Sequence, residues 1–145
     1  MKRIVLDANQ FVSALLKPGS NSAEIISLVR KGILELVISE DIILEIRSVL
    51  LYPKIRKRHN RSHKYIDTFL KKLISIAVLT PEKLKVDIIK EDPSDNKYLD
   101  CAAEGKADFI ISGDHHLKDL KMFREIRILD PYSFLKIINE EFSKK

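Results

Sequence analysis

Short apolar runs alternate along the chain with segments in which apolar residues recur every three or four positions. The runs at 3–6, 34–38, 107–111 and 126–129 have the length of buried strands, and residues 78–79 can form a shorter one. Such alternation is typical of a parallel sheet covered by helices. The pattern therefore predicts an α/β protein of three layers, α/β/α, around a central parallel sheet of about five short strands.

The segments with helical periodicity supply the outer layers of the predicted fold. In one of them Ile42, Ile46 and Leu50 share a face, and Ser39 can cap the first turn. The expected helices lie at 11–16, between the capping residues 20–22 and Gly32, and at 41–51, 65–76, 95–104, 115–120 and 132–141, with a basic connection at 52–64 and no assigned structure at 82–91.

The composition indicates a globular protein, and we expect one domain over residues 1–145. Hydrophobic residues make up 45% of the chain and charged residues 32%, which excludes a disordered chain. The net charge of +5 is compatible with a polyanionic partner. Cys101 is the single cysteine, so no intrachain disulfide can form, and a reducing compartment is expected.

The distribution of apolar residues also bears on the cellular location. No apolar run approaches the ~20 residues that a membrane span needs. The N-terminal segment MKRIVLDANQ does not resemble a signal peptide, because Asp7 interrupts its apolar run. We therefore expect a cytoplasmic protein without a membrane segment.

Two predicted strands are followed by an aspartate. Asp7 comes directly after RIVL, and Asp114 follows FIISG, where the Ser112-Gly113 turn leads the chain out of the core. In open parallel sheets, ligands bind beyond the carboxyl ends of the strands. Asp7 and Asp114 are therefore expected at the same functional edge of the sheet.

Two further acids can join this pair. Glu45 lies beside the apolar stripe of the helix at 41–51, where a carboxylate needs a partner. Asp95 opens the next predicted helix, whose positive end favours its charge. Clustered carboxylates repel one another and their pKa values rise unless a cation compensates. The hard divalent ions Mg²⁺ and Mn²⁺ take such oxygen ligands.

The order of these motifs resembles that of the PIN domain family, the nuclease fold of many VapC-type toxins. The segment IVLDANQFVSALL is similar to the family's opening strand, and DPSDNKYLDCAAEGKADFIISGDHHL is similar to its C-terminal signature. The resemblance runs from residue 2 to about residue 134. Two features depart from it: Gln10 stands where an apolar residue is usual, and residues 52–91 carry no matching motif.

The resemblance implies a catalytic set of four acids, with Asp7, Glu45, Asp95 and Asp114 in the family's order. Three of them, Asp7, Asp95 and Asp114, would be direct ligands of Mg²⁺ or Mn²⁺, and Glu45 would be a ligand or would orient water. The supporting polar residues are Asn9 and Ser13, which could hold the acids or contact phosphate, and Ser112, which could donate a hydrogen bond to Asp7 or Asp114.

The activity implied by the resemblance is that of a metal-dependent ribonuclease that hydrolyses RNA phosphodiester bonds. As a VapC-type toxin it would have an antitoxin protein as partner, and it is expected to form a homodimer. The alternative is a PIN-like module with weak catalysis that binds RNA or protein. An aspartyl phosphatase is disfavoured, because it would need D-x-D where this chain has Asp7-Ala8-Asn9.

Other polar residues near these motifs have competing interpretations. Asp100 is a secondary candidate, because five helical positions rotate it about 140° from Asp95. His115 and His116 are adjacent and expected to point in different directions, which disfavours a histidine metal site. His115 could instead contact substrate phosphate from the rim of the cleft.

A basic run, KIRKRHNRSHK, spans residues 54–64. Such a run is either a solvated surface or a patch that attracts the RNA backbone. If it is an RNA patch, the residues expected to contribute are Arg56, Lys57, Arg58 and Arg61.

Overall fold

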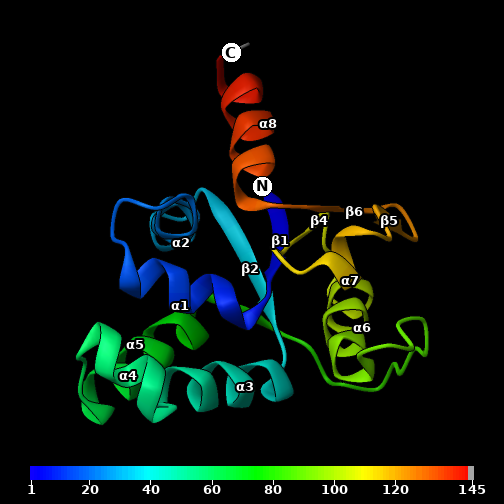
Figure 1. The fold of residues 1–145 in the computed structure, drawn as a ribbon. Helices are drawn as coiled ribbons and strands as arrows, with labels where there is room; N and C mark the ends of the chain where they lie inside the picture. Colours follow the sequence, from blue (N-terminus) through cyan, green and yellow to red (C-terminus); the bar gives the residue numbers. More distant parts are fainter. Residues whose placement is uncertain (144–145) are drawn as a thin grey trace.

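The structure, a computed structural model, describes residues 1–143 and contains a central six-stranded sheet (Figure 1). The strand order is β3-β2-β1-β4-β6-β5, and neighbouring strands are parallel except for the antiparallel pair β5 and β6. The predicted α/β fold is confirmed. The strands are β1 (Lys2–Leu6), β2 (Leu34–Ile38), β3 (Val78–Leu79), β4 (Phe109–Ile111), β5 (Met122–Phe123) and β6 (Ile126–Leu129).

The strand β5 was missing from the sequence prediction. It has two residues, too few to show an alternating pattern. Its turn into β6 places Arg124 and Glu125 at positive φ angles of 55° and 91°. Tight hairpins of this kind usually carry Gly or Asn at such positions, so Arg124 and Glu125 are not recognisable as turn residues from their type.

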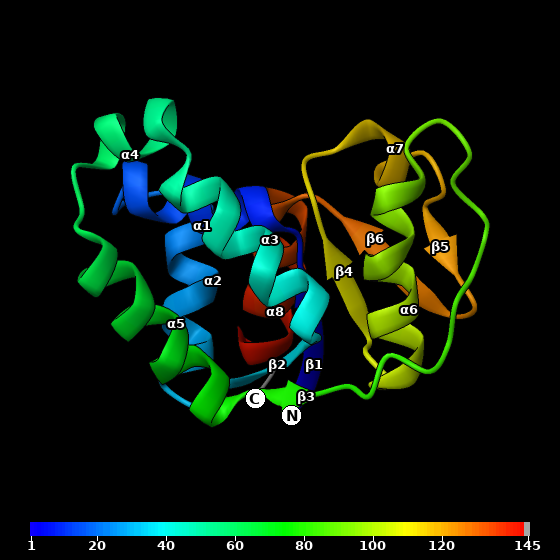
Figure 2. The same ribbon diagram turned by 90° about the horizontal axis from the view of Figure 1, so that it is seen from below.

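Helices cover both faces of the sheet, with α8 on one side and α6 on the other (Figures 1 and 2). The helix α4 was missed, because residues 52–64 were assigned only as a basic connection. Pro53 in its first turn and left-handed Asn60 after its end bound the helix. The helices are α1 (Ala8–Leu16), α2 (Asn21–Arg30), α3 (Glu40–Leu51), α4 (Pro53–His59), α5 (His63–Ile76), the 3₁₀ turn η1 (Pro93–Asp95), α6 (Asn96–Glu104), α7 (His115–Lys118) and α8 (Pro131–Ser143).

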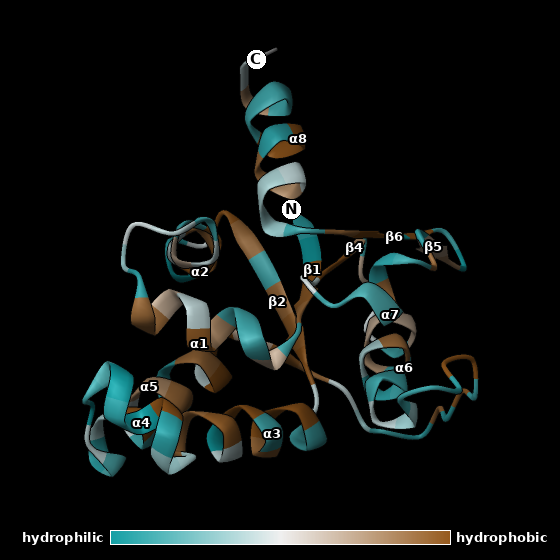
Figure 3. Ribbon diagram, viewed as in Figure 1, coloured by the Kyte–Doolittle hydropathy of each residue, from teal (hydrophilic) through white to brown (hydrophobic). Residues whose placement is uncertain are grey.

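The core lies between the sheet and these helices. Figure 3 shows β2 and β6 as mostly hydrophobic, whereas α4 is mostly hydrophilic. Gly105, at the end of α6, lies tightly against β2, because a Cβ atom there would lie 2.1 Å from Cγ1 of Val37. None of the helices within residues 1–143 has the length and hydropathy to cross a membrane.

The register of the central strands places their carboxyl ends level with each other. Leu6 of β1 is paired with Ile111 of β4. Beyond this pair, the N–H of Asp7 donates to the carbonyl of Ile111 at 3.2 Å, and the N–H of Ser112 donates to that of Leu129 at 2.9 Å. The chain therefore leaves β1 and β4 at one edge of the sheet, as the strand-end aspartates predicted.

The segment left unassigned, 82–91, is irregular and is attached to one face of α6. Its backbone N–H groups donate to the side chains of Asn96, Asp100 and Glu104, which are spaced one helical turn apart. These contacts use backbone donors, so the side chains of the segment need no regular pattern. The donors are Lys83 and Leu84 to Glu104, Val86 to Asp100, and Ile88 and Ile89 to Asn96.

Candidate active site

Asp7 is buried at the turn between β1 and α1. Its Oδ1 atom accepts a hydrogen bond from the N–H of Asn9 at 2.9 Å and so caps α1. Its Oδ2 atom is buried without a hydrogen-bond partner. Burial raises the pKa of Asp7, and polar groups of Ser112, Asn9 and Gln10 offset only part of the increase. An uncompensated carboxylate oxygen at this position can bind a cation.

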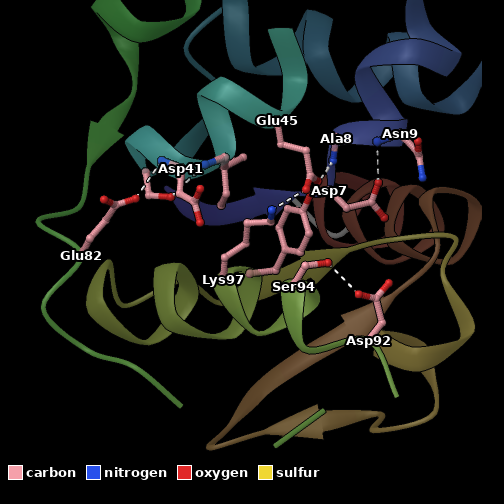
Figure 4. Close-up of polar contacts among 12 residues, drawn as sticks. Asp7, Ala8, Asn9, Asp41, Glu45, Glu82, Asp92, Ser94 and Lys97 are labelled. Atoms are coloured by element: carbon pink, nitrogen blue, oxygen red, sulfur yellow. Dashed lines mark hydrogen bonds and ion pairs between the residues drawn. The ribbon is translucent and has the colours of Figure 1, made fainter. Parts of the chain in front are cut away.

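Glu45 reaches the same region from α3 (Figure 4). Both of its oxygens are engaged by consecutive residues of α6: the hydroxyl of Tyr98 donates to Oε1, and the ammonium group of Lys97 pairs with Oε2. The Tyr98 hydroxyl also accepts a hydrogen bond from the N–H of Ala8 at 3.0 Å. Glu45 is thereby connected to the turn that carries Asp7.

Asp95 lies at the end of η1, directly before α6, rather than inside the predicted helix. Its Oδ2 atom is buried and has no hydrogen-bond partner. The pKa of Asp95 is raised to about 6, first by desolvation and then by the charges of Asp114, Asp92, Glu45 and Asp7. Asp95 therefore lies within electrostatic reach of the other three acids singled out in the sequence.

Asp114 completes the group from the end of the β4 connection. Its Oδ1 atom caps α7 by accepting from the N–H of His116 at 2.7 Å. Its own N–H donates to the hydroxyl of Ser112 at 2.9 Å, and Ser112 is fully buried. Ser112 thus holds the turn that presents Asp114, and toward Asp114 it is an acceptor from the backbone N–H and not the donor that the sequence suggested.

We call the group formed by Asp7, Glu45, Asp95 and Asp114 the carboxylate pocket. Whether a hard divalent cation fits this group can be judged from the oxygen atoms that the group offers as ligands. Two buried carboxylate oxygens, one on Asp7 and one on Asp95, lack any hydrogen-bond partner among the described residues. Burying such atoms is unfavourable unless a cation or a proton satisfies them. Oxygen donors of this kind suit Mg²⁺ and Mn²⁺.

The remaining residues suggested by the sequence lie in different surroundings. Asn9 and Ser13 are both exposed on α1, and Asn9 holds Asp7 through its backbone. Asp100 is buried, and its Oδ1 atom accepts from the N–H of Val86 at 2.7 Å, so it holds the irregular segment. Gln10 accepts a hydrogen bond from the Ser22 hydroxyl at 2.6 Å and thereby links α1 to α2.

The two adjacent histidines lie closer together than expected. The ring centroids of His115 and His116 are 4.0 Å apart, and Nδ1 of His116 lies 3.0 Å from Oε2 of Glu91. The expectation that the two rings point apart was therefore wrong. Their positions, with Glu91, bring three possible metal ligands together, although Glu91 and His115 are exposed.

The basic run forms α4 and the turn that follows it. The turn is fixed by buried His59, whose Nδ1 atom accepts from the N–H of Arg61 at 2.9 Å and whose Nε2 atom lies 2.8 Å from the carbonyl of Leu50. The guanidinium of Arg61 lies 4.7 Å from the centre of the Tyr65 ring. The helix packs beside α1 and α3 (Figure 1).

Sequence reasoning missed Lys97 and Tyr98. Their contacts join α6 to α3 and to the β1–α1 turn, and Tyr98 and Glu45 are 53 positions apart. A possible signal was their position, two and three residues after Asp95 on the same predicted helix. The direction in which these two side chains point, however, depends on how α6 is rotated about its axis relative to α3.

Comparisons with known proteins agree with this architecture. The PIN domain family matches residues 3–116. The uncharacterized protein MJ1680 of Methanocaldococcus jannaschii is 33% identical over 140 residues, which cover 94% of this chain and 81% of the relative.

Two solved structures share the fold at low sequence identity. The complex VapBC2 from Rickettsia felis, bound to a DNA fragment from its promoter, contains a chain with a TM-score of 0.55 and 14% identity, covering 87% of this chain and 96% of that one. FitAcB from Neisseria gonorrhoeae matches with a TM-score of 0.59 and 16% identity, over 89% of this chain and 98% of that one.

A mostly parallel sheet flanked by helices, with Asp7 and Asp114 shortly after the carboxyl ends of β1 and β4, defines a three-layer α/β domain. The family match covers well over half of the sequence. The chain belongs to the PIN domain family, whose members are generally nucleases, and the resemblance found in the sequence is confirmed.

Proposed function

We propose that this protein is a metal-dependent endoribonuclease that hydrolyses RNA phosphodiester bonds. The observation that carries the proposal is the pair of buried, unpartnered oxygens on Asp7 and Asp95 in a pocket of mutually repelling acids. A divalent cation bound among these acids would relieve the repulsion. Membership of a nuclease family supports this interpretation.

The residues divide between holding a cation and holding water. Asp7, Asp95 and Asp114 would bind Mg²⁺ or Mn²⁺. A bound ion of this type supplies an activated water and stabilises charge on the leaving oxygen. Glu45, fixed by Tyr98 and Lys97, would orient the water, since each carboxylate oxygen can accept more than one hydrogen bond.

The RNA backbone would approach this pocket from the surface. His115 is exposed beside Asp114 and could contact a phosphate at the rim. Arg56, Lys57, Arg58 and Arg61 would attract the RNA from α4 and its turn. These contacts would act on phosphates and carry no base preference.

We also propose that the protein is the toxin of a toxin–antitoxin pair acting in the cytoplasm. The fold it shares with chains of the VapBC2 and FitAcB complexes supports this proposal. A groove of about 530 Å³ between α1, α2 and α5 is suited to an antitoxin segment. Its walls include Leu15, Ile26 and Phe69, and Arg30 and Arg61 line it as cations. The occupant would therefore combine apolar and acidic side chains.

A homodimer is part of the same proposal. Tyr132 and Phe142 on α8 are exposed apolar residues that a second copy could cover. Sedimentation velocity over a range of protein concentrations would test it: a single species of monomer mass at all concentrations would exclude the dimer.

The alternative function, a PIN-like module that binds RNA or protein with weak catalysis, is favoured by one observation. Lys97 already neutralises Glu45 inside the carboxylate pocket, so part of its negative charge is compensated by the protein itself. In that case the unchanged protein would cleave RNA only weakly, and substitution of the acids would leave its binding of RNA unchanged.

RNA cleavage in Mg²⁺ or Mn²⁺ tests the proposed function. Asp7→Asn and Asp114→Asn should each abolish cleavage, and a chelator should abolish it in the unchanged protein. Asp87→Asn is the matched control, because Asp87 is an exposed aspartate paired with Lys90. Circular dichroism would verify that the variants fold. Undiminished cleavage by folded Asp7→Asn and Asp114→Asn would contradict the mechanism.

A further inference from the structure

Lys97 is an unusual residue for a pocket that collects acids. It lies on α6, two positions after Asp95, and its side chain is only 15% exposed. Its ammonium group pairs with Oε2 of Glu45 across the gap between α6 and α3 (Figure 4). Lysine is rarely buried to this degree unless it has a charged partner. Lys97 is therefore not a solvated surface lysine, and its pairing with Glu45 calls for a structural or functional explanation.

The two oxygens of Glu45 differ from those of the other acids. Oε1 accepts from the hydroxyl of Tyr98, and Oε2 is paired with Lys97. By contrast, Asp7 and Asp95 each keep a buried oxygen without any hydrogen-bond partner. The carboxylate pocket therefore contains two kinds of oxygen. Those on Asp7 and Asp95 are available to a cation, whereas both oxygens of Glu45 already contact protein side chains.

We propose that Lys97 is a positioning residue that acts as a resident counter-ion: it keeps Glu45 from becoming a direct metal ligand and weakens the binding of the divalent cation. The inference rests on the proposed metal-dependent function and refines the role of Glu45 within it. The ammonium group adds one positive charge to the pocket that a second cation must enter. In the absence of a divalent ion, the same charge reduces repulsion among the acids.

The proposal makes a specific statement about charge. Lys97 and Glu45 together contribute no net charge, so removing both should leave the electrostatic attraction for a cation nearly unchanged. Removing Lys97 alone adds one negative charge, and removing Glu45 alone adds one positive charge. A direct metal ligand behaves differently, because the loss of Glu45 would then weaken binding whether or not Lys97 is present.

The test is calorimetric titration of the full chain with Mn²⁺. Lys97→Met should bind Mn²⁺ about tenfold more tightly than the unchanged protein, and Glu45→Gln about tenfold more weakly. The double variant should return to within about threefold of the original affinity. Lys97→Arg keeps the charge and should behave like the original protein. Arg47→Met is the matched control. Arg47 lies on the same helix as Glu45 and forms an exposed ion pair with Asp67.

Two outcomes would overturn the inference. The first is an unchanged or weaker Mn²⁺ affinity in Lys97→Met, which is the result expected if the ion pair only holds α3 against α6. The second is a double variant as weak as Glu45→Gln, which would make Glu45 a direct ligand.

Titration of Asp7→Asn separates this inference from the proposed function. If Asp7→Asn loses Mn²⁺ binding while Lys97→Met is unchanged, the role of Lys97 is wrong and the metal site stands. If Asp7→Asn binds Mn²⁺ as tightly as the original protein, both are wrong.

Discussion

The hydroxyl of Tyr98 accepts a hydrogen bond from the backbone N–H of Ala8 at 3.0 Å, deep inside the protein. The same hydroxyl donates to Glu45, so one atom on α6 ties together the first turn of α1 and the middle of α3. Burial and the neighbouring Glu45 raise the pKa of Tyr98, so its proton is retained at all ordinary pH values.

Tyr98→Phe should therefore destabilise the fold. It leaves the Ala8 N–H and an oxygen of Glu45 without their partner, and each such loss costs about 1–3 kcal/mol in the free energy of unfolding. Urea unfolding followed by circular dichroism measures the change. Tyr132→Phe is the control, because Tyr132 is exposed and its substitution should change stability by less than about 0.5 kcal/mol. Equal stability of the two variants would contradict the bridging role.

The raised pKa of Asp95 predicts how stability depends on pH. Folding raises it from 3.8 to about 6, so the folded state binds a proton more tightly than the unfolded state. This favours the folded state below pH 3.8, and the advantage is lost as the pH rises to about 6. Without divalent cations, the contribution of Asp95 to the melting temperature should fall across this interval. In Asp95→Asn the melting temperature should fall less over this pH interval than in the original protein. An identical dependence on pH in the two proteins would refute the raised pKa of Asp95.

Gly105→Ala should be strongly unfavourable. The added Cβ atom would meet the side chain of Val37 at 2.1 Å, so α6 or β2 must shift. Overpacking of this kind costs about 1–3 kcal/mol in the free energy of unfolding. Gly19→Ala is a suitable comparison, because nothing lies within 4 Å of a Cβ atom at Gly19. Thermal unfolding of the two variants should therefore show a large loss only for Gly105→Ala.

Neutralising the basic residues of α4 and its turn should weaken RNA binding in a salt-dependent way. Replacement of Arg56, Lys57, Arg58 and Arg61 by Gln removes up to about four phosphate contacts, and the slope of log affinity against log salt should fall by up to about three for single-stranded RNA. Filter binding over a series of salt concentrations measures this slope. An unchanged slope would rule out a contribution of these residues, and Arg47→Gln supplies a control on the neighbouring helix α3.

The sequence allowed the sheet and the acids to be anticipated for a simple physical reason. Buried parallel strands are continuous apolar runs, and their carboxyl ends meet at one edge. Asp7 and Asp114 follow two such runs, so their proximity needed no knowledge of side-chain packing. Glu45 and Asp95 were singled out from their helical positions and from the family resemblance, and the charge of Glu45 is one of those that raise the pKa of Asp95.

Other features depend on contacts that no local pattern contains. The helix α4 lies in a run of cations without an apolar stripe, and the short strand β5 relies on positive φ angles at Arg124 and Glu125. Lys97 and Tyr98 meet Glu45 only because α6 and α3 pack at a particular rotation. Predicting them would have required the tertiary structure itself.

The attachment of segment 82–91 to α6 has a consequence for how this region can vary. The side chains of Asn96, Asp100 and Glu104 accept hydrogen bonds from the backbone of the segment and not from its side chains. The exposed residues of the segment can therefore vary, whereas Ile89 is buried in the core. Proline is excluded wherever an N–H is used, as at Val86 and Ile89. The segment could therefore follow the same backbone path in relatives whose residues differ there. We expect the three anchoring side chains on α6 to be retained in those relatives.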